Sequence, residues 1–455
     1  MNSNQADIIV IGSGPAGLEA ATRLAAGSLT VTLLTTTPPG GRATVGSLVP
    51  SKGWLHAIHH GRAALGDDEG VARAAASIRE LVAERVRASE ARLRGHGVRI
   101  LRGVARVSDE NTVTFRPLDS DGAAGEAQTL QSRAVVLATG SEPTFAPDLK
   151  PDGQRMIAPR HTQHMTGRPS SMIVAGGGIT GVEYGSVFAG MGLPVELIAS
   201  REVLPNADRE HVARLLDRLR EQGMQVTSGR RVERAISTES GVTATLDDGS
   251  ERRASHLFLG TGRAGDLSVL EGATVKPETH SSGAFLRVDS EGRSSIPGLW
   301  ACGDLTGGPL TATRAVLQAR RLAGTLRAEL GDLPDHESPD ALPPAADSDT
   351  AFTQVVYTDP QLAQIGPVGE LATRGDLRLE RRSYRDSVTG SLEQDDGELK
   401  LWVSDTGQIA GASAIGGNAA ELLAPVQLAM HHGISAAALS AAPFAYPSFA
   451  EIVTL

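Results

Sequence analysis

Two glycine-rich loops, each placed between an apolar strand pattern and a helical pattern, constrain the fold most strongly. One loop follows the apolar run 7–12 and the other follows 171–178. Their glycines are Gly12, Gly14 and Gly17 in the first and Gly176, Gly178 and Gly181 in the second. This spacing gives a tight turn, close backbone approach to a pyrophosphate and a helix N-terminus that favours an anion. One such loop is a weak signal, but two correctly placed copies predict an α/β fold with two Rossmann-like modules and two dinucleotides.

The rest of the chain shows helical and strand periodicity in turn. Apolar residues recur at helical spacing over 66–94, which predicts a long amphipathic helix. Alternating residues between 98 and 118 predict an antiparallel meander, and a second meander over 243–262 closes the second module. A segment rich in Pro, Asp and Ser at 331–349 indicates a linker, and 350–455 has the pattern of a separate α+β domain.

Composition excludes several classes of protein. A chain of 455 residues exceeds what one hydrophobic core usually supports. A net charge of −10 and the lack of a Lys/Arg run argue against a nucleic-acid partner. We expect no membrane span and no signal peptide, because apolar runs are short. The sole cysteine, Cys302, predicts a small buried side chain rather than a reactive thiol, in a protein of the reducing cytoplasm.

Neither module has the acidic residue that usually binds ribose hydroxyls at the end of the second strand. In the first module the position falls on Thr35, so a hydroxyl serves the ribose or that contact is lost. In the second it falls on Ala199, followed by Ser200 and Arg201. A missing carboxylate removes repulsion toward a 2′-phosphate, which Arg and Ser can bind, so NADPH is favoured over NADH. A solvated Arg201 without a ligand is the alternative.

Four further motifs occur in a specific order along the chain. They are AVVLATGSEP at 134–143, GTGR at 260–263, IPGLWACGD at 296–304 and VVYTDPQLAQIG at 355–366. With both glycine loops, they resemble the pyridine nucleotide–disulfide oxidoreductases nearly end to end, in the manner of dihydrolipoamide dehydrogenase and mercuric reductase. The resemblance implies FAD in the first module, a nicotinamide nucleotide in the second, and a homodimer that completes each active site.

The resemblance also implies domain boundaries and cofactor-binding residues. The FAD-binding domain spans 1–145 and is completed by 280–335, the NAD(P)-binding domain spans 146–279, and the dimerisation domain spans 350–455 after the 331–349 linker. The residues expected at FAD are Gly12, Gly14, Pro15, Ala16, Gly17, Thr35, Gly41, Lys52, Thr139, Gly140, Gly303 and Asp304. Those expected at the nicotinamide nucleotide are Gly176, Gly178, Gly181, Ser200 and Arg201, and Gly262 and Arg263 of the GTGR segment are also expected to bind a cofactor. Asp304 is similar to the aspartate that holds the ribityl chain.

The stretch PPGGRATVGSLVPSKGWLH at 38–56 is similar to the family's redox-active disulfide loop but contains no cysteine. With the register set by its glycines and its Pro-Ser-Lys ending, the two cysteine positions fall on Ala43 and Leu48. Neither side chain forms a thiolate, which excludes the family's dithiol chemistry. Both are expected to line an apolar substrate pocket. Arg42 and Trp54 flank the two cysteine positions without an assigned role.

The family's second catalytic element, a His-Pro followed by a Glu from the partner subunit, is also altered. Tyr446 replaces the His before Pro447, and Glu451 keeps the acid position. A Tyr is a poor acid–base group near neutrality, but it donates a hydrogen bond to a carbonyl or quinone oxygen. A Tyr that only fills the space is the equal alternative. We expect the Tyr446–Pro447 bond to be cis, as in the family.

Lys52 and Glu183 match the family's ion pair, with the Lys beside the flavin's reactive nitrogen and the Glu near the nicotinamide. A cation there stabilises the negative charge that a flavin gains with a hydride. A surface lysine and a helix acid are the alternatives. The expected catalytic residues are Lys52, Glu183, Tyr446 and Glu451.

These residues predict an FAD-dependent NAD(P)H oxidoreductase that passes electrons directly to a small organic acceptor such as a quinone. The alternatives are a tailoring flavoenzyme for one biosynthetic intermediate, or a catalytically decayed flavin-binding protein. His56, His59 and His60 have helical spacing for two metal ligands, but no further Cys or acid completes a site, so we expect no metal.

Overall fold

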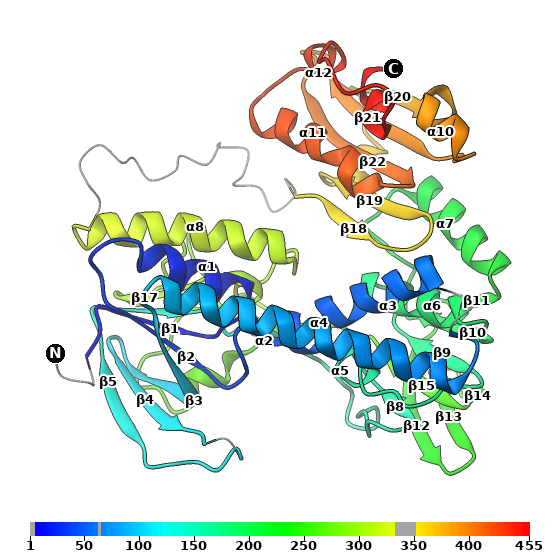
Figure 1. Ribbon diagram of the computed structural model, residues 1–455. Coiled ribbons are helices and arrows are strands. Elements are labelled where there is room, and N and C mark those ends of the chain that lie inside the picture. The colour runs from blue at the N-terminus through cyan, green and yellow to red at the C-terminus, as the bar shows by residue number, and fades with distance from the viewer. Residues whose placement is uncertain (1–4, 62–64, 120, 333–351) are drawn as a thin grey trace. The chain divides into compact units, whose positions relative to one another are not determined.

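The computed structural model describes residues 5–61, 65–119, 121–332 and 352–455 (Figure 1). The described chain divides into two compact units. The first contains the residues up to Pro50, those from Arg79 to Thr144, and those from Arg263 to residue 332. The second contains Ser51–Ile78, Phe145–Gly262 and 352–455. Apart from Gly331 and Asp332, the predicted linker lies outside the described residues.

The first unit is organised by a seven-stranded sheet in the order β17-β6-β1-β2-β3-β4-β5. Its strands are β1 (Ile8–Ile11), β2 (Val31–Thr35), β3 (Arg99–Asp109), β4 (Thr112–Pro117), β5 (Gln128–Gln131), β6 (Ala134–Leu137) and β17 (Leu299–Ala301). The five strands from β17 to β3 run parallel, and β4 and β5 continue as the antiparallel meander that the sequence predicted. Strands β1, β2 and β6 are buried along their whole length, as expected for a parallel sheet covered on both faces.

Helices of the first unit cover and border this sheet. They are α1 (Pro15–Leu24), α2 (Gly41–Gly46), α8 (Ala312–Glu329) and the part of α4 (Asp68–Gly95) from Arg79 onward. The first residues of α3 (Leu48–Gly61), up to Pro50, also belong to the first unit. Small residues of α1, Ala16, Ala20 and Ala21, pack with Ala315 and Ala319 of α8 in one core cluster. The predicted helix over 66–94 is confirmed as α4.

The nucleotide module of the second unit contains a parallel five-stranded sheet in the order β11-β10-β9-β15-β8. Its strands are β8 (Met156–Ile157), β9 (Met172–Ala175), β10 (Val195–Ala199), β11 (Met224–Ser228) and β15 (His256–Leu259), with helices α5 (Pro159–Thr162), α6 (Ile179–Gly190) and α7 (Arg209–Glu221). The predicted meander over 243–262 is only partly right. An antiparallel sheet forms from β12 (Val232–Thr238), β13 (Gly241–Leu246) and β14 (Glu251–Ala254), whereas the apolar β15 joins the buried parallel sheet.

The C-terminal domain is the predicted α+β domain. Its antiparallel sheet has the order β18-β19-β22-β21-β20. The strands are β18 (Gln354–Val356), β19 (Gln361–Ile365), β20 (Leu377–Ser383), β21 (Glu398–Ser404) and β22 (Ile409–Gly416), and the helices are α9 (Val368–Leu371), α10 (Val388–Leu392), α11 (Ala419–His431) and α12 (Ala436–Ser440). Leu422, Leu423 and Val426 of α11 are buried against apolar residues of β19, β21 and β22.

Within the described residues, no helix is long and apolar enough to cross a membrane.

Candidate functional site

The first glycine loop is built so that only glycine fits at its ends. Gly12 has φ of +110°, and a Cβ there would overlap the carbonyl oxygen of Ala138 at the end of β6. A Cβ on Gly17 would overlap the carbonyl oxygen of Gly12. The loop therefore turns tightly between β1 and α1, and α1 packs close to the sheet. These close contacts explain why the tight turn predicted from the sequence needs glycine at both positions.

The middle glycine of each loop leaves open space for a ligand. A Cβ on Gly14 would meet nothing within 4 Å, and the same holds for Gly178. Gly14 and Gly178 are the N-cap residues of α1 and α6, and neither helix is capped by a side chain. First-turn N–H groups left open in this way suit an anion such as a pyrophosphate. Both loops thus fit the dinucleotides that the sequence predicted.

Residues at the carboxyl ends of parallel strands meet around the first loop, the place where such sheets bind ligands. Asp304 follows β17 in a 3₁₀ turn (Gly303–Thr306), and a Cβ on Gly303 would come within 2.9 Å of Ala16 Cβ at the start of α1. Ser141, after β6, donates from Oγ to Asp304 Oδ2 at 2.6 Å. Asp304 therefore lies close to the start of α1 and is held there by Ser141.

Arg263 completes a short polar chain with Ser141 and Asp304. Its Nε donates to Ser141 Oγ at 2.7 Å, and its Nη2 donates to the Ser141 carbonyl oxygen at 2.6 Å. Burial lowers the pKa of Arg263 from its usual value, and the nearby Asp304 opposes that shift. Arg263 is expected to bind a cofactor, and in the structure its guanidinium bonds Ser141, which in turn donates to Asp304.

Thr35 is buried, with 5 % of its surface exposed, and its hydroxyl is already hydrogen-bonded. Thr35 Oγ1 donates to the carbonyl oxygen of Thr37 at 2.7 Å and lies 2.7 Å from Ser13 Oγ. These bonds close the turn after β2 on the glycine loop. A hydroxyl that is already bonded in this way contributes little to the binding of a ribose.

The stretch 38–56 is mainly helical rather than a loop. Gly41 has φ of +58°, and a Cβ there would come within 2.7 Å of the Gly14 backbone, so the chain packs directly on the first glycine loop. Helix α2 then carries Ala43, and α3 begins at Leu48. The helices are separated at Ser47, which has φ of −144° and ψ of −77°. Ala43 is half-buried and Leu48 is 42 % exposed, so both apolar side chains reach the surface of the first unit.

Arg42 anchors α2, a role the sequence did not reveal. Its guanidinium donates to the Thr139 carbonyl oxygen at 3.0 Å and to Asp266 Oδ2 at 2.8 Å, and it pairs with Glu142. Thr139 Oγ1 in turn donates to the carbonyl oxygen of Asp266 at 2.8 Å. Because these partners are far apart in sequence, no local motif marks Arg42 as the residue that fixes the helix bearing Ala43.

The second glycine loop repeats the geometry of the first. Gly176 has φ of +128°, and a Cβ on it would overlap the carbonyl oxygen of Gly260. A Cβ on Gly177 would come within 2.5 Å of the Ala199 Cβ, so a small side chain fits at Ala199. The two residues that follow β10, Ser200 and Arg201, are exposed. They stand at the strand end where a nucleotide ribose would be read.

Lys52 and Glu183 form the predicted ion pair. Lys52 Nζ donates to Glu183 Oε1 at 2.7 Å and to Oε2 at 2.8 Å. Glu183 lies on α6, two residues after Gly181, with 4 % of its side chain exposed, whereas the Lys52 side chain is 33 % exposed. A buried carboxylate is thus paired with a cation that keeps access to solvent.

Tyr357 is the second residue that the sequence did not single out. Its backbone N–H donates to Glu183 Oε1 at 3.0 Å, and Lys52 Nζ lies 4.4 Å from the centre of its ring. Burial raises the pKa of the Tyr357 phenol, and Glu421 and Glu183 add to that rise. One residue of the C-terminal domain therefore contacts both members of the ion pair.

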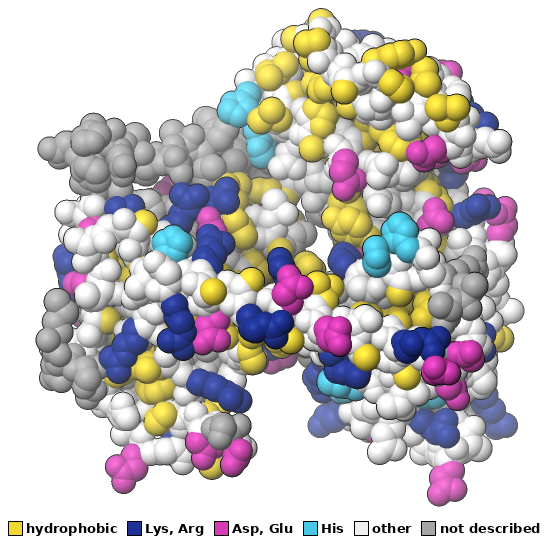
Figure 2. Space-filling view, viewed as in Figure 1, with side chains coloured by type: hydrophobic (Ala, Val, Ile, Leu, Met, Phe, Trp, Pro, Cys, Tyr) yellow, Lys and Arg dark blue, Asp and Glu magenta, His cyan; other side chains and the backbone are white. Residues whose placement is uncertain are grey.

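Tyr446 and Glu451 lie near the end of the chain. The Tyr446–Pro447 bond is cis, as predicted, and the Tyr446 side chain is 72 % exposed. Glu451 is in a 3₁₀ turn (Phe449–Thr454), where its Oε2 accepts a hydrogen bond from the Val388 N–H at 3.4 Å. In Figure 2, hydrophobic side chains gather on the C-terminal domain, where Leu392, Leu428 and Ile434 are exposed.

The remaining candidates have structural surroundings. Burial raises the pKa of the Cys302 thiol to about 12, and this side chain lies in the core as predicted. Trp54 is 1 % exposed and lies in the core of the second unit. His56, His59 and His60 are exposed on α3, and no cluster of three metal-ligating side chains occurs among the described residues.

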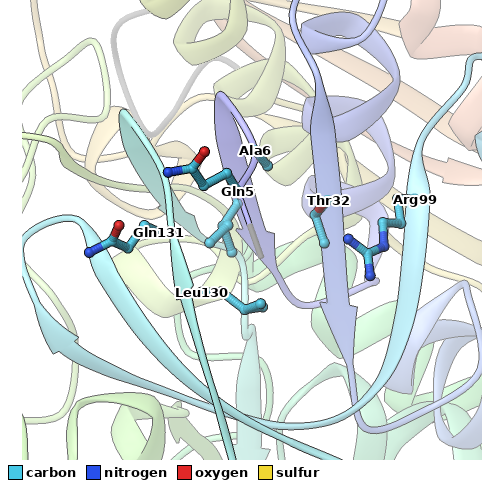
Figure 3. Close-up of a pocket in the computed structure, with 7 residues that line it drawn as sticks. Gln5, Ala6, Thr32, Arg99, Leu130 and Gln131 are labelled. Carbon is cyan, nitrogen blue, oxygen red and sulfur yellow. The ribbon is translucent and has the colours of Figure 1, made fainter. Parts of the chain in front are cut away.

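A small pocket in the first unit is lined by other residues (Figure 3). It is lined by Gln5, Ala6, Ile9, Thr32, Arg99, Leu130 and Gln131. Ala6, Thr32 and Arg99 lie near the beginnings of β1, β2 and β3, whereas the glycine loop follows the end of β1. This pocket is not part of the cofactor site.

Comparison with known proteins identifies the family. The family described as "Pyridine nucleotide-disulphide oxidoreductase" matches residues 6–319. The family described as "Pyridine nucleotide-disulphide oxidoreductase, dimerisation domain" matches residues 352–455. The chain is 28 % identical to a dihydrolipoyl dehydrogenase of Geobacillus stearothermophilus, with 98 % of this chain and 94 % of the relative covered. It is 27 % identical to an NAD(P)H dehydrogenase (quinone) of Mycobacterium tuberculosis, with 98 % and 92 % covered.

Among solved structures, LpdA from Mycobacterium tuberculosis matches with a TM-score of 0.85 and 26 % identity, over 98 % of both chains. This likeness and the two family matches cover the glycine loops, the ion pair and the C-terminal domain. The chain belongs to the pyridine nucleotide–disulphide oxidoreductase family, whose members bind FAD and NAD(P)H.

Proposed function

We propose that this protein is an FAD-dependent NAD(P)H oxidoreductase that passes electrons directly from reduced flavin to a small organic acceptor such as a quinone. The observation that carries the proposal is the intact Lys52–Glu183 pair in a chain whose cysteine positions hold Ala43 and Leu48. The ion pair expected to assist flavin reduction is present, whereas the two cysteines of a disulfide relay are replaced. The similarity to an NAD(P)H dehydrogenase (quinone) supports the same acceptor class.

FAD supplies the hydride- and electron-accepting ring, and NAD(P)H supplies the hydride. The N–H groups at the starts of α1 and α6 would hold the two pyrophosphates, and Asp304 would accept a hydrogen bond from the ribityl chain. The Lys52 ammonium would stabilise the negative charge that a bound flavin gains with a hydride. Glu183 holds that ammonium in position. Ala43 and Leu48 present an apolar surface that suits a flat, conjugated acceptor.

Tyr446 serves the acceptor half of the reaction in this proposal. Its exposed phenol hydroxyl donates a hydrogen bond to the carbonyl or quinone oxygen of the acceptor. The site is completed in a homodimer, with Tyr446 and Glu451 of the partner subunit beside Ala43 and Leu48. The dimerisation domain and its exposed apolar side chains support that assembly.

The nicotinamide nucleotide is NADPH in this proposal. Ala199 leaves no carboxylate to repel a 2′-phosphate, and the exposed Arg201 and Ser200 follow it directly. An Arg fork pairs with a phosphate through two hydrogen bonds. A lone cysteine, which cannot form a disulfide within the chain, supports a location in the cytoplasm, where thiols are kept reduced.

A catalytically decayed flavin-binding protein is the second candidate, and the hydrogen bonding of the Thr35 hydroxyl favours it. The hydroxyl of Thr35 is bonded to Thr37 and Ser13, so the first module offers no free acceptor from that residue to a ribose. The Lys52–Glu183 pair opposes this candidate, because a decayed protein has no reason to keep it. A tailoring flavoenzyme for one intermediate shares the proposed mechanism and differs only in acceptor.

Anaerobic rapid mixing of the holoenzyme with NADPH separates these candidates. The proposal expects fast bleaching of the flavin absorbance, followed by rapid recovery when a quinone is added. A flavin that NADPH never bleaches identifies the decayed protein. Fast bleaching with recovery only by one conjugated carbonyl compound, and by no quinone, identifies the tailoring enzyme.

A further inference from the structure

Tyr357 belongs to the C-terminal domain yet contacts the ion pair of the nucleotide module in the same chain. Its ring centre lies 4.4 Å from Lys52 Nζ, and its N–H donates to Glu183 Oε1 at 3.0 Å. Lys52 Nζ thus has three fixed neighbours, the two oxygens of Glu183 and the face of the Tyr357 ring. A lysine stem is flexible, and three neighbours define where its ammonium stands.

We infer that Tyr357 is a positioning residue for flavin reduction, which holds the Lys52 ammonium through its ring and the Glu183 carboxylate through its backbone. This inference rests on the proposed function, in which Lys52 stabilises negative charge on the reduced flavin. It gives the dimerisation domain a second task within its own chain, beyond joining two subunits.

The energetics of a partly buried ion pair explain why such a residue is needed. Glu183 is buried, so the pair gives up solvation that its mutual attraction repays only when the geometry is good. The N–H of Tyr357 satisfies a further lone pair of the carboxylate, and the electron-rich ring face attracts the ammonium. Because burial raises the pKa of the phenol, Tyr357 stays neutral and presents a ring rather than a competing anion.

The position of Tyr357 is itself fixed by the C-terminal sheet. It directly follows β18, which pairs with β19, and the next residue, Thr358, is fully buried and donates to the Pro360 carbonyl oxygen at 2.7 Å. The sheet is tied to α7 by Lys400, whose Nζ donates to Asp208 Oδ1 at 2.8 Å. The ring therefore sits on a rigid support.

Chemical labelling of Lys52 in the holoenzyme measures how firmly its ammonium is held. Site-resolved acetylation, followed by mass spectrometry, gives the rate for Lys52 alone. Replacing Tyr357 by Leu removes the ring and should speed labelling roughly threefold to tenfold, whereas Tyr357→Phe restores the ring and should return the rate to within about twofold of wild type. Phe352→Leu is the matched control, an aromatic truncation in the same domain with no contact to the pair, and should leave the labelling rate of Lys52 unchanged.

Stopped-flow reduction by NADPH shows whether Tyr357 acts through Lys52. Tyr357→Leu should slow flavin reduction roughly threefold to tenfold without raising the NADPH concentration needed for half-saturation. In a Lys52→Met background the same change should cause no further slowing. Tyr357→Met is a second ringless variant, to be used if the Leu variant does not fold.

Unchanged labelling in both ringless variants, or equal slowing with and without Lys52, overturns the inference. If wild-type flavin is not reduced by NADPH, the proposed function fails, but the labelling comparison still decides whether Tyr357 holds Lys52. The two failures are therefore distinguishable.

Discussion

Lys52 donates two hydrogen bonds from Nζ to the carboxylate of Glu183, at 2.7 and 2.8 Å, across a sequence separation of 131 residues. The pair joins the start of α3 to α6, and α6 begins at the second glycine loop. A cation on α3 is in this way tied to the helix that would bind the nicotinamide nucleotide.

Replacement of Lys52 by Met should slow flavin reduction by NADPH about 100-fold, because the charge that stabilises the reduced flavin is lost. Glu196→Gln is the control, since Glu196 pairs with Arg252 in the same module at 3.0 Å and lies outside the proposed site. Anaerobic stopped-flow absorbance gives both rates. Equal rates in wild type and Lys52→Met would contradict the role of the ammonium.

Replacement of Gly14 by Val should abolish FAD binding while the fold persists. The added side chain meets no protein atom within 4 Å of its Cβ position, so it projects into the space assigned to the pyrophosphate. Flavin content after purification and the midpoint of thermal unfolding measure the two effects. Gly95→Val is the control, because Gly95 at the end of α4 is equally open. Full flavin content in Gly14→Val places the cofactor elsewhere.

Replacement of Arg201 by Glu should weaken the binding of NADPH about tenfold or more, because a carboxylate repels a 2′-phosphate. The binding of NADH, which lacks that phosphate, should change little. Saturation curves of flavin reduction with each nucleotide measure the preference. Arg230→Glu is a control for the change in net charge, since Arg230 pairs with Asp248 in the same unit. A similar loss with both nucleotides shows that Arg201 does not read the phosphate.

Replacement of Tyr446 by Phe should slow reoxidation of the reduced enzyme by a quinone roughly tenfold and leave reduction by NADPH unaffected. The reason is that Phe keeps the ring but loses the donor for the acceptor oxygen. Sequential-mixing stopped flow separates the two half-reactions. Unchanged reoxidation indicates that Tyr446 fills space only, the alternative raised from the sequence.

The lowered pKa of Glu19 should make the stability of the first unit sensitive to acid. Burial alone would raise its pKa, but hydrogen bonds from Arg23, Arg320 and Arg92 outweigh burial and lower the pKa to about 2. A carboxyl whose pKa is lowered by folding stabilises the fold above its unfolded value of 4.5, and this stability is lost as the pH falls toward 2. The contribution is about 3 kcal/mol at most.

Glu19→Gln should therefore lower stability at pH 7 and flatten its dependence between pH 4.5 and 2. Urea unfolding at a series of pH values measures this. Glu69→Gln, which breaks an exposed pair with Arg73, should keep the wild-type slope. A wild-type slope in Glu19→Gln would show that other carboxyls dominate acid unfolding.

The sequence predicted the features that depend on local chain geometry. The glycine loops were predictable because a turn between strand and helix restricts Gly12 and Gly176 to positive φ. The α+β character of 350–455 followed from periodicity. The meander at 243–262 was only partly right, because β15 pairs with remote strands and not with its neighbour in sequence.

Features that depend on distant partners were beyond the sequence. Arg42 binds Asp266, and Tyr357 binds Glu183, at separations of 224 and 174 residues. No local motif signals such contacts. Thr35 was expected to face a ribose or leave that contact unmade, and its bonds to Thr37 and Ser13 are set by how the turn after β2 closes. The Lys52–Glu183 pair was predicted only through the family resemblance.

The most direct test of the central claim is the reoxidation of the reduced holoenzyme by a panel of quinones under anaerobic conditions. The enzyme is first reduced with one equivalent of NADPH, and flavin absorbance is followed after mixing with each quinone. Direct transfer predicts fast, quinone-dependent recovery that thiol-alkylating reagents do not affect, because Ala43 and Leu48 replace the cysteines and Cys302 is buried. Recovery no faster than with molecular oxygen, for every quinone tested, would contradict the account.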